Sequence, residues 1–89
     1  MNIDETLNDR GSKYGEFSGN AAVSQRLKSI ARFELSYRDK VLAPDQIEAL
    51  DMIFHKIARI INGDPDYADS WVDIAGYATL VANRLESKK

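Results

Sequence analysis

Two amphipathic stretches joined by a short Asn-Gly-Asp-Pro segment constrain the fold of this 89-residue chain more than any other feature. In each stretch apolar residues recur every three or four positions, which places them on one stripe of an α-helix. Pro44 suits the first turn of a helix, and Gly63 suits the left-handed backbone conformation that often ends one. Pro65 prevents the helix from continuing. The stripes are Ile47, Leu50, Phe54, Ile57 and Ile61, followed by Trp71, Ile74, Ala78, Val81 and Leu85. Because the connection is short, we expect an antiparallel helical hairpin.

The same periodicity extends over most of the chain. It predicts three principal helices, at about residues 19–36, 44–62 and 67–86, preceded by a short N-terminal helix or turn. Ser18 or Asn20 is the expected N-cap of the first principal helix. We therefore expect a single all-α domain over residues 1–89, a small helical bundle built around the hairpin.

Residues 10–20 carry three glycines spaced four apart, a density that favours an ordered loop over a helix. One interpretation is a phosphate contact, because Arg10 and Lys13 supply positive charge close to the start of the next helix. The other is a tight structural connection, with Tyr14 and Phe17 packed on the core.

Composition narrows the classes of function. With 12 Lys and Arg against 14 Asp and Glu the chain is mildly acidic, which argues against nucleic-acid binding through a basic surface. It has no cysteine, which excludes disulfides and cysteine-based zinc sites, and it has no apolar run long enough to span a membrane. We expect a cytoplasmic protein. Because so small a core leaves little stability, and the second hairpin helix has apolar residues on two sides, we also expect a homo-oligomer, a dimer or larger.

Acidic side chains follow the edges of the two hairpin helices. Glu48, Asp51, His55 and Arg59 are three or four residues apart on the first helix, and Asp69 and Asp73 are four apart on the second. If the two edges face each other, the carboxylates of Glu48, Asp51, Asp69 and Asp73 form an oxygen-rich site suited to Mg²⁺ or Mn²⁺. We expect Glu48 or Asp51 of the first helix to approach Asp69 or Asp73 of the second closely enough to share one ion.

Ordinary surface ion pairs explain the same spacing. Asp73 is the most informative of these acids, because it lies among apolar residues and Tyr77, where a carboxylate needs a partner. Its alternative partner is Lys56 or Arg59 in a structural ion pair.

Three segments carry a resemblance to known families. Arg10-Gly11-x-x-Tyr14-Gly15-x-Phe17, residues 46–60 and residues 69–78 resemble a family of small uncharacterised bacteriophage and prophage proteins. The second half also resembles the MazG-type all-α nucleotide pyrophosphatases and the phage nucleotide-modification-associated helical domains. Those enzymes hold Mg²⁺ with an ExxE pair and a later ExxD pair. Glu48-x-x-Asp51 matches the first pair with one acid shortened, whereas Asp69 and Asp73 are spaced one residue further apart than the second.

The resemblance implies a phage-encoded, MazG-like protein of the host cytoplasm that binds nucleotides or acts as a nucleotide pyrophosphohydrolase. In that function Arg10, Lys13, Lys56 and Arg59 would neutralise phosphates. His55, Tyr14 and Tyr77 are further candidate site residues. Basic residues beside the acids argue against efficient turnover. The alternative is a non-enzymatic oligomer that binds a host protein or sequesters a nucleotide signal.

Overall fold

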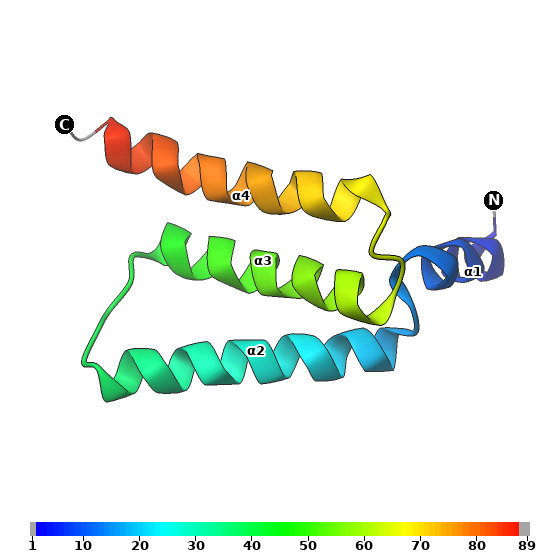
Figure 1. The fold of residues 1–89 in the computed structure, drawn as a ribbon, viewed down its shortest axis with the longest axis horizontal. Helices are drawn as coiled ribbons and strands as arrows, with labels where there is room; N and C mark the ends of the chain where they lie inside the picture. The colour runs from blue at the N-terminus through cyan, green and yellow to red at the C-terminus, as the bar shows by residue number, and fades with distance from the viewer. Residues whose placement is uncertain (1, 88–89) are drawn as a thin grey trace.

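The computed structural model describes residues 2–87, which form four helices and no strand (Figure 1). They are α1 (Ile3–Tyr14), α2 (Phe17–Tyr37), α3 (Pro44–Asn62) and α4 (Ala68–Glu86). The predicted all-helical class is confirmed, and the bounds of the three long helices differ from the expected ones by no more than two residues. Within the described range, no helix is both long and apolar enough to cross a membrane.

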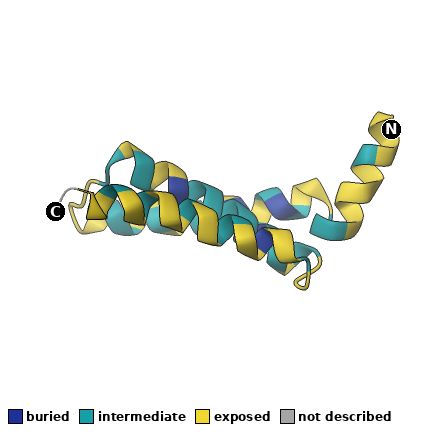
Figure 2. Cartoon of the chain, turned by 90° about the horizontal axis from the view of Figure 1, so that it is seen from above, coloured by how far each residue is buried: buried dark blue, intermediate teal, exposed yellow. Residues whose placement is uncertain are grey.

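The three long helices form a single layer. In Figure 1, α3 lies between α2 and α4 and runs in the opposite direction to each. It contacts both neighbours, whereas α2 and α4 do not contact each other within the described residues. Seen from above, the three long helices occupy one band. α1 projects from the end of this band at which α2 begins, and the N-terminus points away from it (Figure 2). The molecule measures 46 × 29 × 23 Å, so it is an elongated slab.

The buried residues of this slab are small or of medium size. Among residues 2–87, no large side chain is fully enclosed. The buried set consists of Asn20, Ser24, Ala49, Ala58 and Ser70. Small side chains let neighbouring helix backbones approach closely, while many of the larger apolar side chains remain exposed.

The expected loop over residues 10–20 is wrong, because most of it is helical. Gly11 lies inside α1, where it is exposed and tolerated, and α1 gains a cap at its start from Asn2, whose side chain accepts the Glu5 backbone N–H at 2.9 Å. Gly15 and Glu16 separate α1 from α2, and Gly15 has a φ of 81°, a left-handed conformation that favours glycine. The predicted N-caps are also wrong: α2 begins after Glu16, and the amide of Asn20 contacts Asn62 instead.

Gly63 ends α3 as predicted, but not in a left-handed conformation, since its φ is −119°. The residue is needed for a different reason. A Cβ atom at this position would lie 2.3 Å from the carbonyl carbon of Tyr14. The N–H of Asp64 donates to the carbonyl of Lys13 at 2.8 Å, which fixes the end of α3 against the end of α1.

A second link joins the far ends of α3 and α4. The guanidinium of Arg84, in the last turn of α4, donates two hydrogen bonds to the carboxylate of Asp45, in the first turn of α3. Each charge also suits its helix end, since a carboxylate near an N-terminus and a cation near a C-terminus are favourable. Arg84 holds the pKa of Asp45 below its ordinary value of 3.8.

Candidate functional site

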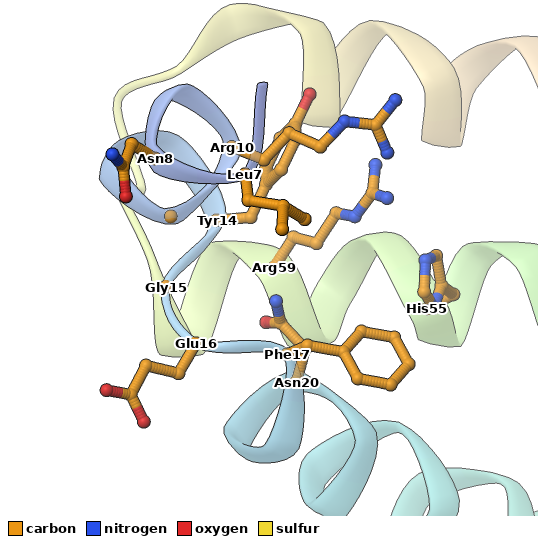
Figure 3. A pocket seen from close by; sticks show the side chains of 11 residues that line it. Leu7, Asn8, Arg10, Tyr14, Gly15, Glu16, Phe17, Asn20, His55 and Arg59 are labelled. Carbon is orange, nitrogen blue, oxygen red and sulfur yellow. The ribbon is translucent and has the colours of Figure 1, made fainter. Parts of the chain in front are cut away.

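A pocket of about 500 Å³ lies where α1, the start of α2 and the second half of α3 meet (Figure 3). Its lining includes Leu7, Arg10 and Tyr14 of α1, Phe17 and Asn20 of α2, and His55 and Arg59 of α3. A volume of this size is within the range of small-molecule sites, which start at about 300 Å³.

Asn62 holds the corner that shapes this pocket. Its side-chain amide donates to the backbone carbonyls of Tyr14 and Glu16, at 3.3 and 3.0 Å, and to the side-chain oxygen of Asn20 at 3.1 Å. A Cβ on Gly15 would lie 2.4 Å from Asn62, so the turn between α1 and α2 requires a glycine for space as well as for conformation. One side chain of α3 thereby fixes both helices that wall the pocket.

Arg10 and Arg59 bring two guanidinium groups from different helices to the pocket. Figure 3 shows both extending in the same direction past Tyr14, while the carboxylate of Glu16 points away. Arg59 lies over the ring of Tyr14, with its guanidinium carbon 4.1 Å from the ring centre, a cation–π contact that limits its freedom. Among residues 2–87, no carboxylate forms a salt bridge with either arginine. Both positive charges therefore remain available to an anion.

The pKa of His55, on the same side of α3, is lowered by its surroundings. Partial burial lowers its pKa from the ordinary value of 6.5, and the positive charges of Arg59, Lys56 and Lys28 lower it further. The imidazole is consequently neutral at pH 7. It can donate or accept a hydrogen bond in the pocket, and it adds no charge.

The other two predicted phosphate-binding residues have partners elsewhere. Lys13 pairs with Asp9 at 3.2 Å and lies 5.1 Å from the ring centre of Tyr67, and the hydrogen bond to Asp9 raises the pKa of Lys13. Lys56 pairs with Asp73 at 3.0 Å, and its side chain is only 12% exposed. The structure thus brings Arg10 and Arg59 together and engages Lys13 and Lys56 in ion pairs.

The four predicted metal-binding acids occupy different surroundings. Glu48 lines a groove between α3 and α4 that also contains Tyr77, whereas Asp51 lines a groove between α2 and α3. Asp69 accepts a hydrogen bond from the hydroxyl of Tyr67 at 3.0 Å, and this bond raises the pKa of Tyr67. Asp73 has the ion-pair partner that sequence considerations offered as the alternative, Lys56.

No group of three or more His, Cys, Asp or Glu side chains within residues 2–87 is placed to hold a metal ion. A single copy therefore does not gather the four carboxylates into one site. The sharing of an ion by two of them stays a prediction.

Sequence patterns did not indicate two residues of the pocket region. Asn20 was expected at a helix cap and instead lines the pocket, and Asn62 was read only as part of a connection. Phe17, expected on the core in one interpretation, is 78% exposed and forms part of the pocket wall. Sequence spacing does not predict this pocket, because the pocket depends on how α1 and the start of α2 pack against α3.

Fold and site together define an all-helical, single-layer protein with a pocket that combines arginines and aromatic rings. Over residues 3–85 the chain matches the family described as "Domain of unknown function (DUF6378)", and it belongs to that family. Neither the curated proteins nor the solved structures contain a match to it.

Proposed function

We propose that this protein binds a nucleotide-type ligand in the pocket between α1, α2 and α3, with Arg10 and Arg59 on the phosphate. One observation carries the proposal: two arginines from different helices line one pocket, and no carboxylate among the described residues pairs with either. Two positive groups without a counter-ion repel each other, and an anion between them removes that cost. The planar guanidinium fork matches the geometry of phosphate oxygens.

The aromatic lining supports a ligand with a ring. Phe17 is largely exposed at the pocket wall and Tyr14 lies beneath Arg59, so a flat ring entering the pocket meets apolar faces on the way to the charges. Asn20 and neutral His55 add hydrogen-bonding groups. Free phosphate uses only the arginines, whereas a nucleoside phosphate uses both parts of the pocket. The resemblance to MazG-type proteins supports the same ligand class.

Turnover has weaker support than binding. Hydrolysis of the MazG type needs several carboxylates around Mg²⁺ or Mn²⁺, and in one chain Asp73 is engaged by Lys56 while Asp69 is engaged by Tyr67. These residues do not fit a metal centre built by one copy. The proposed role is therefore binding or sequestration of a nucleotide, without efficient metal-dependent hydrolysis.

Calorimetric titration of the full chain with ATP, AMP, adenosine and inorganic phosphate tests the proposal. Nucleoside phosphates are expected to bind more tightly than adenosine or phosphate alone, and to bind less tightly as salt increases. Arg10→Gln and Arg59→Gln should each weaken binding by about tenfold or more, the loss expected for a charge-assisted hydrogen bond. Arg26→Gln, an exposed site on α2 outside the pocket, is the matched control and should bind like the unaltered protein.

Circular dichroism establishes that each variant is still helical. The proposal is wrong if the unaltered protein binds no nucleoside phosphate, or if Arg26→Gln weakens binding as much as the two pocket variants do. Equal affinity for phosphate and for nucleotides would remove the role of the aromatic wall.

A further inference from the structure

Helical spacing places most residues of the two apolar stripes on the same side of α3 and α4, here called the stripe face. It is formed by Ile47, Leu50, Ile57 and Ile61 of α3 and by Trp71, Ala78 and Leu85 of α4. A groove between α3 and α4 contains Leu50 and Ala78, and a groove between α2 and α3 contains Leu50 and Ile47. Leu42 lines both grooves as well, so both open on the same side of α3.

The stripe face remains substantially exposed in one chain. Ile61 is 63% exposed and Trp71 is 55% exposed. Neither α2 nor α4 covers this face of α3, because the two helices lie on opposite sides of α3 and do not contact each other within the described residues. Exposed apolar area forgoes about 25 cal/mol per Å² of stabilisation, so a contiguous face of this kind favours a covering layer.

The chain exposes more surface than a compact monomer, and the excess is large enough for a stable interface. The chain exposes 6434 Å², which is about 1,200 Å² more than a compact monomer of its 10.0 kDa mass. Its radius of gyration is 15.2 Å, against about 12 Å for a compact domain of this length. A standard interface buries about 800 Å² per partner, so the surplus of about 1,200 Å² is more than one such interface needs.

We infer that a second copy of this chain covers the stripe face, and that two layers stacked face to face form the core that one layer lacks. Helical domains are stable when two layers enclose apolar side chains between them. A two-fold axis places the same patch on both sides, so an apolar face meets an equally apolar one. The groove beside the face carries charges of both signs, since Lys28, Arg32 and Asp51 line it.

This assembly leaves the ligand pocket open. With 3.6 residues per turn, His55 and Arg59 lie on the side of α3 opposite Leu50 and Ile57. Stacking through the stripe face therefore turns both pockets outward. Self-association does not rest on the proposed ligand binding, and either can fail while the other stands.

Two isoleucines provide a matched pair for the test. Ile61 lies on the stripe face, whereas Ile30 lies with Phe33 and Tyr37 on the outer side of α2, and the two isoleucines are equally exposed at 63%. Because both side chains are largely exposed in a single chain, a change of either to lysine should leave the fold of one chain intact. The two variants therefore test the interface and not the stability of the fold. Light scattering of the full chain should give a mass of at least two chains for the unaltered protein and for Ile30→Lys. Ile61→Lys should raise the dissociation constant by about tenfold or more, because it places a charge in an apolar interface.

Each alternative outcome overturns the inference. A monomeric mass for the unaltered protein at high concentration leaves the stripe face to a different protein. Dissociation by Ile30→Lys without dissociation by Ile61→Lys places the interface on α2 instead. If both variants dissociate equally, the stripe face has no special role. Helical circular dichroism of Ile61→Lys is required, and Leu50→Gln, at the centre of the same face, replaces it if that variant does not fold.

Discussion

The side chain of Asn62 makes three hydrogen bonds that join the end of α3 to the junction of α1 and α2. Its one amide group satisfies two backbone carbonyls at the junction of α1 and α2 and also contacts Asn20. The Glu16 carbonyl also accepts the backbone N–H of Asn20 at 3.1 Å, whereas the Tyr14 carbonyl lies at the end of α1, where the helix supplies no further donor. The corner and the pocket therefore depend on a residue that contacts no ligand.

Asn62→Ala should lower the free energy of unfolding by about 1–3 kcal/mol, the cost of leaving partly buried polar groups without partners. Chemical denaturation measures the change, and Asn83→Ala, on an exposed part of α4, is the control. Nucleotide affinity should fall as well, because α1 loses its anchor on α3. A variant with unchanged stability would show that the Gly63 contact alone holds the corner.

At the scale of helices, the ends of α3 and α4 are joined by the ion pair of Asp45 and Arg84. Asp45 has a lowered pKa, so the pair stabilises the fold above the ordinary pKa of 3.8 and is lost as the pH falls through the lowered value. Asp45→Asn should therefore lower the melting temperature at pH 7 and make little difference well below pH 3.8. Glu34→Gln, which breaks the exposed pair with Arg38 one turn away on α2, should have a smaller effect at pH 7. Equal effects of the two variants would contradict a special role for the link between α3 and α4.

The helices themselves were largely predictable from sequence, and their arrangement was not. Pro44 and the apolar period located α3 because these signals act within one helix. The glycines of residues 10–20 led to the wrong prediction of a loop, since Gly11 is accommodated inside α1 and, among these glycines, only Gly15 has a positive φ. Gly63 was correctly placed at a helix end, but it is needed there for a contact with α1 that is distant in sequence.

The site was predictable to the same limited extent. Arg10 and Arg59 were both expected to bind phosphate, but 49 positions separate them, and only the packing of α1 on α3 unites them. Lys56 and Asp73 were expected as alternative partners because a carboxylate among apolar residues needs a cation, and their pairing is confirmed. The stripes were correctly recognised as apolar helix faces, whereas sequence periodicity does not tell whether the covering layer belongs to the same chain.

For the whole molecule, one way remains to form the predicted metal site: self-association that brings acidic residues of two copies together around a metal ion. Purified protein with Mg²⁺ or Mn²⁺ and a panel of nucleoside triphosphates tests it, with pyrophosphate release as the measurement. We expect no metal-dependent release, because Lys56 neutralises Asp73 and lies where a metal ion would have to approach. Asp73→Asn should instead weaken the link between α3 and α4 by about 1 kcal/mol, measured by denaturation.

A double-mutant cycle separates the two roles of Asp73. If the residue acts through its ion pair, Lys56→Met and the double variant should show a stability coupling of about 0.5–1 kcal/mol with Asp73→Asn. Glu86→Gln, an exposed acid in the last turn of the same helix, is the control without a partner among residues 2–87. Metal-dependent pyrophosphate release that disappears in Asp73→Asn, while its stability is unchanged, would assign Asp73 to a metal site and make this protein an enzyme.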